Sequence, residues 1–494
     1  MSTLYQAMPL WVLLISLVTA VAVFIAGEKW QRLRTAFNLS GAVLKLVLVA
    51  IMLWGVDLGH TFVVHLPLLP GLNLVLQADA LALLFMSLSA VLWLVTTVYA
   101  IAYLERAPDR ARFFGFFSLC VTATMGIAMA GNLFTFFVFY ELLTLATWPL
   151  VIHRGTDKVM VAGRTYLHYT LGGGAVFLLG IVLLYHLAGP TDFVAGGELL
   201  HLGEDHAGAL TAIFVLLIIG VGVKAAIVPL HGWLPTAMVA PAPVSALLHA
   251  VAVVKAGAFG IVRVVHDVYG VELVQQLHLG TALAVVASIT IIYGSLRAIW
   301  QTDLKRRLAF STVSQVSYVA LGVAMGSPLA TIGGLVHLVH QGLMKITLFF
   351  CAGAYAETYG IHAIRELDGI GRRMPWTTAM FTLGAFGMIG VPPLAGFISK
   401  WYLGLGAVDA HQYWVIPVLL GSTVLNAIYF LPLLHRAWFR PLAITDKDRG
   451  EAHPGLLWPT VFTGLSAMGV GLLAAFAWSP LGWVELIVVR EYGL

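Results

Sequence analysis

Six charged side chains lie inside long apolar stretches of this sequence. They are Lys45, Glu141, Lys224, Lys255, Lys345 and Lys400. A charged group within the hydrocarbon of a membrane costs about 2.5 to 3.5 kcal/mol on insertion scales, so its usual explanation is a function. A buried lysine can take up or release a proton, because burial disfavours the ammonium form and a nearby carboxylate favours it. The six residues therefore indicate a path for protons.

Histidines in the same stretches could extend this path, because imidazole both donates and accepts hydrogen bonds near neutral pH. Taken singly, each could equally be a packing residue. We predict that Glu141 and Lys224 form a coupled pair whose charges interact when they approach. The predicted relay contains Glu141, Lys224, His249, Lys255, Lys345 and Lys400, with His231, His337 and His340 in support. A fixed salt bridge that pins two helices is the structural alternative for the pair.

Two of the lysines could instead reach the membrane surface. Lys45 is expected within about a turn of a helix end, where its side chain could snorkel to water, so we leave it out of the relay. Lys400 stands beside Trp401 and Tyr402, which are typical of the outer membrane interface. Snorkelling therefore remains an alternative for Lys400.

The elements that position these residues are predicted to be membrane-spanning helices. Of the 494 residues, 60% are hydrophobic and only 10% are charged, which excludes an ordinary soluble protein. Apolar runs and short loops predict an all-α integral membrane fold with about fourteen spans. The first run lacks a basic leader and a cleavage site and is interpreted as a retained helix.

Basic residues are concentrated in alternate connections between the predicted spans. These connections are residues 29–34, 106–112, 154–164, 297–307, 365–373 and 436–449. The connection at 187–210 carries Asp192, Glu198, Glu204 and Asp205 and no lysine or arginine. The positive-inside rule then places the basic loops in the cytoplasm and both termini outside. We expect a multi-pass protein of the bacterial inner membrane.

Prolines interrupt two of the predicted spans. The seventh contains Pro229, Pro235, Pro241 and Pro243, and the twelfth contains Pro392 and Pro393. Each break is the fourth member of a five-span unit, one at 109–270 and the other at 277–442. Because each unit has an odd number of spans, the second unit lies inverted in the membrane relative to the first. Transporters that bind ions at broken helices have this organisation. Residues 1–108 supply three further helices, and 455–494 supply the last helix and a tail. The alternative is that proline only kinks packed helices.

Five stretches resemble the proton-conducting, antiporter-like subunits. They are NLFTFFVFYELLTLATWPLV, VKAAIVPLHGWLPTAMVAPAPVSALLHAVAVVKAG, QTDLKRRLAFSTVSQVSYV, HLVHQGLMKITLFFCAGA and GVPPLAGFISKWYL. That family includes the large membrane-arm subunits of respiratory complex I, the A and D subunits of Mrp sodium/proton antiporters, and homologues in membrane-bound hydrogenases. The resemblance covers about residues 110 to 435. It implies a fourteen-helix subunit with two inverted repeats that moves protons within a larger complex.

The resemblance also implies roles for single residues. Glu141 matches the family glutamate of the fifth helix, and Lys224 matches the lysine of the broken seventh. Lys255 matches an eighth-helix lysine, and Lys345 matches a lysine that follows histidines in the eleventh helix. Lys400 matches the lysine near the break of the twelfth and argues against the complex I subtype with glutamate there. We therefore favour a chain similar to the Mrp D subunit.

The predicted function is proton translocation, with monovalent cation/proton antiport preferred. A proton-pumping subunit of a quinone oxidoreductase or membrane-bound hydrogenase is the main alternative, and a structural scaffold is a further one. The expected partners are other membrane subunits, the lipid bilayer, protons and, for an antiporter, sodium ions. No nucleic acid is expected, since the net charge is only +4. We expect no cofactor, metal or catalytic residue of an enzyme, and only two cysteines are present. A haem between His168 and either His249 or His337 would explain none of the lysines.

Overall fold

The computed structural model describes residues 3–105, 107–442 and 450–493. Position 106 and residues 443–449, which belong to two of the predicted basic connections, lie outside the described residues. The side chain of Glu204, one of the four acids predicted in the connection at 187–210, lies outside them too.

The first part of the chain contains three long helices and a small hairpin that the all-α prediction missed. Its elements are α1 (Thr3–Gln6), α2 (Met8–Ala26), α3 (Gln31–Asp57), β1 (Phe62–Leu69), β2 (Leu72–Ala78) and α4 (Ala80–Tyr103). The strands pair antiparallel, and Gly71 at their turn has a φ of +79°. Asp79 follows the hairpin and caps α4 by accepting a hydrogen bond from the Ala82 amide at 2.6 Å.

The part of the chain from Arg110 to Gln276 contains the first broken helix. Its elements are α5 (Arg110–Ala128), α6 (Leu133–Val151), α7 (Asp157–Ala188), η1 (Leu200–Leu202), α8 (Gly203–Ala225), α9 (Trp233–Thr236), η2 (Ala237–Val239), α10 (Ala242–Ala246), η3 (Leu247–Val251), α11 (Val253–Arg263), η4 (Val264–Tyr269) and α12 (Val271–Gln276). Helix α8 ends at Ala225, and Pro229 lies in the irregular segment before α9, which confirms the predicted break. Pro241 and Pro243, which are predicted to belong to this break, begin the next helix instead, because proline suits the first turn of a helix.

The remaining chain contains the second broken helix. Its elements are α13 (Leu279–Ile299), α14 (Leu304–Ala324), α15 (Pro328–Tyr359), η5 (Ile364–Leu367), η6 (Ile370–Arg372), α16 (Pro375–Ile389), α17 (Ala395–Asp409), α18 (Val415–Phe439), α19 (Pro454–Leu472) and α20 (Pro480–Arg490). The break with Pro392 and Pro393 separates α16 from α17, as predicted. Gly390 ends α16 with a φ of +93°, a conformation that favours glycine.

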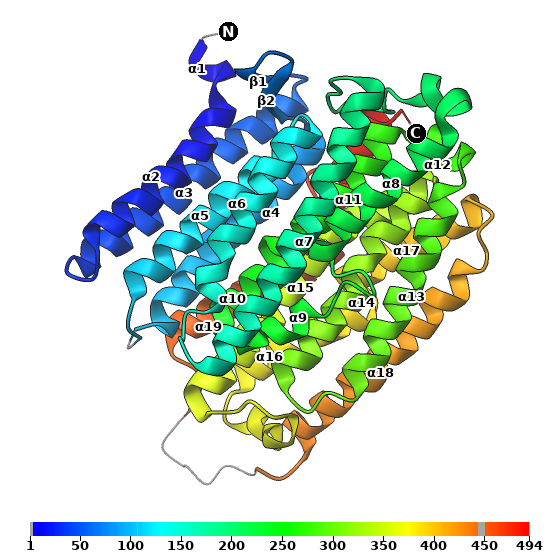
Figure 1. Ribbon diagram of the computed structural model, residues 1–494. Helices are drawn as coiled ribbons and strands as arrows, with labels where there is room; N and C mark the ends of the chain where they lie inside the picture. The colour runs from blue at the N-terminus through cyan, green and yellow to red at the C-terminus, as the bar shows by residue number, and fades with distance from the viewer. Residues whose placement is uncertain (1–2, 106, 443–449, 494) are drawn as a thin grey trace.

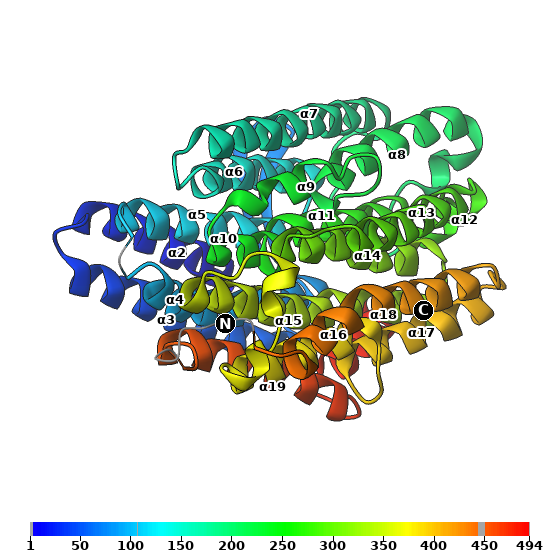
Figure 2. The same cartoon turned by 90° about the horizontal axis from the view of Figure 1, so that it is seen from below.

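Twelve helices in the described part of the chain are long and apolar enough to cross a membrane. The predicted fourteen spans correspond to these twelve, to α14 and to the α16–α17 pair. The segment Ala242–Tyr269 and helix α15 are buried throughout their most apolar windows. Figure 2 shows α11, α14 and α15 in the interior, with α7 on one side and α17 and α18 on the other. The helical membrane fold is confirmed.

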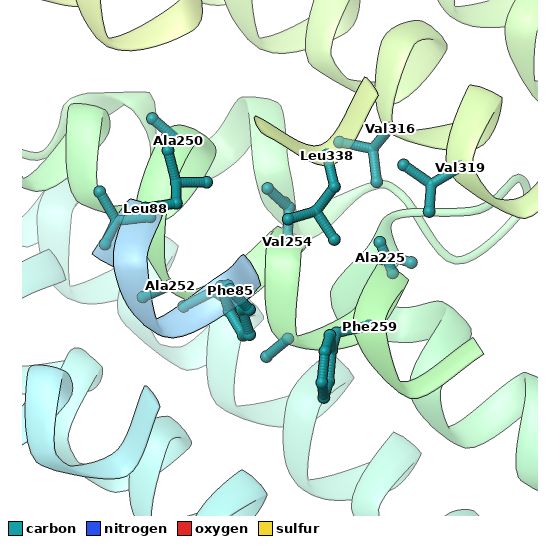
Figure 3. Packing of buried hydrophobic residues seen from close by; sticks show 14 of the residues in the cluster. Phe85, Leu88, Ala225, Ala250, Ala252, Val254, Phe259, Val316, Val319 and Leu338 are labelled. Atoms are coloured by element: carbon teal, nitrogen blue, oxygen red, sulfur yellow. The ribbon is translucent and has the colours of Figure 1, made fainter. Parts of the chain in front are cut away.

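Apolar side chains close the interior around α11 and α15. The ring centroids of Phe85 on α4 and Phe259 on α11 lie 5.1 Å apart. Figure 3 shows Val254, Leu338 and Val316 gathered between α11, α15 and α14. These side chains are fully or almost fully buried, so polar groups among them are shielded from bulk water.

The two ends of the bundle differ in composition. One end, which we call the basic end, carries the predicted basic connections between helices. At the basic end, Arg112 donates to the His153 carbonyl at 2.9 Å and Lys305 donates to the Ala240 carbonyl at 2.7 Å. The opposite end, which we call the hairpin end, carries β1 and β2 and the loop before α8 (Figure 1). Also at the basic end, backbone hydrogen bonds from Ala363 and His362 lower the pKa of Glu366 below its usual value.

Glu451 caps the first turn of α16, and this contact can be tested by mutation. Its carboxylate accepts hydrogen bonds from the Trp376 amide at 2.8 Å and the Thr377 hydroxyl at 2.6 Å. The variant Glu451→Gln removes the negative charge that favours a helix N-terminus, so we expect a loss of about 1 kcal/mol of stability. Thermal unfolding of the purified protein measures this loss. The exposed Glu198→Gln, in the loop before α8, is the control, and equal unfolding temperatures for both variants would contradict the assignment.

Candidate functional site

Lys224 lies on the last turn of α8, directly before the first break, and is fully buried. Its ammonium group donates to the backbone carbonyl of Tyr140 on α6 and lies 3.3 Å from the centre of the Tyr140 ring. The carbonyl ends of a helix attract a cation, as does the face of an aromatic ring. At the first break, the positive charge of Lys224 is therefore partly compensated by backbone carbonyls and an aromatic ring, without a carboxylate.

Glu141 is the next residue on α6, so the backbone brings it beside the partner of Lys224. Its Oε1 atom is buried and has no hydrogen-bond partner among the described residues. A Cβ atom at Gly174 would overlap this oxygen, so only glycine leaves room for the carboxylate there. Glu141 and Lys224 form no ion pair in the described structure. Glu141 and Lys224 are therefore close to each other without a direct ion pair. The structural alternative instead requires a fixed salt bridge between them.

Helix α11 passes directly against Lys224. A Cβ atom at Gly257 would overlap the Ala225 nitrogen and lie 2.6 Å from the Lys224 carbonyl carbon. Lys255 lies two residues earlier on α11, so its side chain leaves the helix on a different side from this contact. The Lys255 side chain is fully buried, and its Nζ atom has no hydrogen-bond partner within the described ranges.

The close approach at Gly257 predicts a large effect for a single methyl group. In Gly257→Ala the added carbon would collide with the α8 backbone, so the two helices must separate. We expect a loss of about 1 to 3 kcal/mol of stability and a displaced Lys224. Thermal unfolding measures the first effect, and proton flux through the reconstituted complex measures the second. Gly172→Ala, at a position with open space around it, is the matched control on α7. Equal behaviour of the two variants would contradict this contact.

His249 lies in η3, a π-helical turn between α10 and α11. Neither ring nitrogen has a hydrogen-bond partner in the part of the chain that is described, although the ring is fully buried. The ring stacks on Phe349 of α15, with centroids 4.5 Å apart. π-helical turns often mark functional positions, because they turn side chains away from the regular helical rows.

Three relay candidates lie along α15, and all three are fully buried. Lys345 donates to the Leu308 carbonyl at 3.1 Å and to the Ser311 hydroxyl, both on α14. Five residues earlier, His340 has no partner for either ring nitrogen among the residues described. One turn further along, the Nδ1 atom of His337 lies 2.8 Å from the Ser399 hydroxyl. Helix α15 therefore connects α14 to the second broken helix.

Lys400 lies on α17 and turns back to the second break. Its ammonium group donates to the Ile389 carbonyl at 2.7 Å, at the end of α16, and to the Thr423 hydroxyl at 3.1 Å. It also lies 5.7 Å from the centre of the Tyr318 ring, which contacts the ring of His337. The Lys400 ammonium group therefore binds carbonyls at the second break, which differs from the snorkelling alternative.

His231 and His168 lie apart from this row. His231 is half-buried in the first break, where its ring contacts the rings of Tyr293 and Phe310. His168 is exposed on α7, whereas His249 and His337 are fully buried.

The sequence did not indicate two buried glutamines, and its prediction for the depth of Lys45 was wrong. Gln315 on α14 and Gln341 on α15 are buried, and their amide atoms have no hydrogen-bond partners among the described residues. An uncharged amide in an apolar run gives a weaker signal than a charge, so the sequence does not single it out. Lys45 is predicted to snorkel, but it is fully buried. Helix α3 begins at Gln31, so Lys45 lies about four turns inside it.

Several residues along the row have buried polar atoms without a hydrogen-bond partner among the described residues. These atoms belong to Glu141, His249, Lys255, Gln315, His337, His340 and Gln341. Buried polar groups in folded proteins nearly always have hydrogen-bond partners, supplied by the protein or by water. The row therefore combines ionisable groups with two uncharged amides, and these atoms make no hydrogen bond to the described part of the protein.

The chain also matches a known protein family. A family described as "NADH:quinone oxidoreductase/Mrp antiporter, TM" matches residues 130–426, more than half of the chain. The chain belongs to this family.

Relatives come from both branches of the family. NADH-quinone oxidoreductase subunit N of Desulforudis audaxviator is 34% identical over 417 residues, which are 81% of this chain and 82% of the relative. The D subunit of the Na(+)/H(+) antiporter of Alkalihalophilus pseudofirmus is 26% identical over 85% of this chain and 83% of the relative. A chain in the structure of the Mrp complex from Dietzia sp. DQ12-45-1b matches with a TM-score of 0.86 and 23% identity, covering 99% and 98%. The predicted family is confirmed, while identity alone does not favour the D-like interpretation.

Proposed function

We propose that this chain is the proton-translocating subunit of a multisubunit membrane complex that exchanges a monovalent cation for protons. The observation that carries the proposal is the buried row of ionisable groups that joins the two broken helices. This row runs from Lys224 at the first break, through α11 and α15, to Lys400 at the second.

The first step of the proposed relay uses Glu141 and Lys224. When the carboxylate approaches, Lys224 holds its proton, and when it withdraws, the ammonium can pass a proton to a neighbour. The partner of Lys224 is a backbone carbonyl, which stabilises the ammonium less than a carboxylate would. The observed arrangement therefore supports a state from which Lys224 can release its proton.

The middle steps are proposed to pass through water. Lys255, His249 and His340 are buried and lack protein partners among the described residues. Water molecules between them would satisfy these groups and would also conduct protons. The surrounding apolar contacts, such as that between Phe85 and Phe259, would confine this water to the row.

The direction of the chain in the membrane is part of the proposal. We place the basic end in the cytoplasm and both termini outside, in the inner membrane of a bacterium. The described arginines and lysines at the basic end, among them Arg112 and Lys305, support this placement.

A proton-pumping subunit of a quinone oxidoreductase or hydrogenase complex is the second candidate. The 34% identity to an NADH-quinone oxidoreductase subunit favours it over a scaffold, since such a subunit would use the same proton row. In either complex, other membrane subunits and lipid would cover the exposed apolar side chains of α2, α3, α7 and α18.

Purification of the native complex tests the proposal. Small membrane subunits that copurify with this chain would support the antiporter, and iron-sulfur or hydrogenase subunits would support the second candidate. In proteoliposomes, we expect the complete complex to move protons and the complex without this subunit to lose most of that flux. Equal flux with and without the subunit would contradict both candidates.

A further inference from the structure

Lys45 is a buried charged group that the proposed relay does not use. Its ammonium group donates to the Ser16 hydroxyl on α2 and lies 4.9 Å from the centre of the Trp93 ring on α4. The side chain is fully buried, and no carboxylate pairs with it within the described ranges. A permanent ammonium ion in such a place is costly, so a role in packing alone explains Lys45 poorly.

Polar side chains join Lys45 to the basic end along one side of α3. The Thr122 hydroxyl donates to Ser16 at 2.8 Å and to the Ser118 carbonyl at 3.0 Å. The Ser118 hydroxyl donates to the Asn38 amide oxygen at 3.4 Å. These contacts continue from the lysine through α2 and α5 and back to α3.

The row continues from Asn38 to a carboxylate in water. Asn38 donates to the Arg34 carbonyl at 3.1 Å, and the Arg34 guanidinium pairs with Glu28 at 2.9 Å. Arg34 is 2% exposed, whereas Glu28 is 52% exposed. From Arg34 to Lys45 the helix rises about 16 Å, roughly half the hydrocarbon thickness of a membrane.

Further hydroxyl groups lie on the opposite side of Lys45. Ser89 and Thr96 share the face of α4 that carries Trp93, since they lie four residues before it and three after it. Both hydroxyls are buried and have no hydrogen-bond partner among the described residues. Helix α4 itself contacts η3 and α15, which carry His249 and Lys345.

We infer that Lys45 is a proton-binding site at the inner end of a second uptake branch, which begins at Glu28 and runs between α2, α3 and α5. The inference rests on the proposed function, because it supplies protons to the same transporter. A hydronium ion at the basic end protonates Glu28, and water along the hydroxyl row carries the proton to the Lys45 amine. The resulting ammonium passes its proton on through water beside Ser89 and Thr96, and Lys45 returns to the amine.

Three variants of the complete complex in proteoliposomes test the inference. Lys45→Met removes the site, and Lys45→Arg keeps a cation that does not give up its proton. We expect both to lower proton flux at least about tenfold, because proton transfer at a positioned group typically contributes that much or more. Glu28→Gln keeps an acceptor for the Ala111 amide, which Glu28 Oε1 binds at 2.5 Å, and should lower the flux severalfold.

The outcomes separate this inference from the function itself. Wild-type flux in Lys45→Arg together with a loss in Lys45→Met would mean that a fixed cation suffices, and this would overturn the branch. Wild-type flux in Lys45→Met would also overturn it. If the Lys45 variants fail to assemble, the exposed Glu28→Gln variant decides, and unchanged flux in it rejects the branch. If Lys224→Met also keeps its flux, the proposed function fails; if only that variant loses flux, the branch alone fails.

Discussion

The variant Lys224→Met is expected to abolish proton transport while the complex still assembles. Methionine fills a similar volume but binds no proton, so the first transfer from the broken helix is lost. We expect a reduction of at least about 100-fold, in the usual range for removal of a group that transfers a proton. Proton flux in proteoliposomes that contain the purified complex measures this effect.

The control for this prediction is Lys158→Met, at an exposed lysine near the start of α7. It removes the same charge without touching the row, and its flux should equal that of the wild type. Lys224→Arg is a second comparison, because arginine keeps the cation and does not release its proton. Full transport in Lys224→Arg would show that only a fixed charge is needed, and it would contradict the relay.

The variant Glu141→Gln is expected to lower proton flux by at least about tenfold, because the amide cannot attract or release the proton of Lys224. The Oε1 atom of Glu141 has no hydrogen-bond partner among the described residues, and a glutamine of nearly the same shape keeps an oxygen that can accept from the Thr144 hydroxyl. Assembly and unfolding temperature should therefore stay near the wild-type values. Flux and thermal unfolding, measured on the same preparation, separate the two effects.

Glu198→Gln, at an exposed glutamate in the loop before α8, is the matched control. It should leave flux unchanged. If Glu141→Gln instead lowers the unfolding temperature and leaves the flux of the remaining complex intact, Glu141 is a packing residue and the scaffold alternative gains support.

The sequence predicted the spans and both breaks because their signals are strong and local. A long apolar run must cross the membrane, and proline in such a run interrupts the helix whatever surrounds it. The start of a helix is a weaker signal. The sequence therefore does not separate Pro241 and Pro243, which begin α10, from the break, and it does not show how far Lys45 lies from a helix end. The hairpin was missed because its residues continue the apolar pattern of the neighbouring spans.

The candidate site was predictable as far as it depends on charge. A lysine or glutamate in an apolar run stands out, and Lys224, Lys255 and Lys345 are all fully buried. The partners of Lys224, Lys345 and Lys400 could not be predicted, because they are the Tyr140 carbonyl, serine and threonine hydroxyls, and carbonyls freed at the second break. Backbone groups are present at every residue, so only the packing of the helices decides which of them a lysine meets.

The most direct test of the relay is the proton flux of Lys255→Met. Lys255 makes no hydrogen bond or ion pair within the described part of the chain, so a purely structural role predicts no loss of stability when its ammonium group is removed. The relay predicts that flux falls at least about 100-fold while the unfolding temperature is unchanged or higher. Wild-type flux through the assembled Lys255→Met complex would contradict the claim that protons pass along this row.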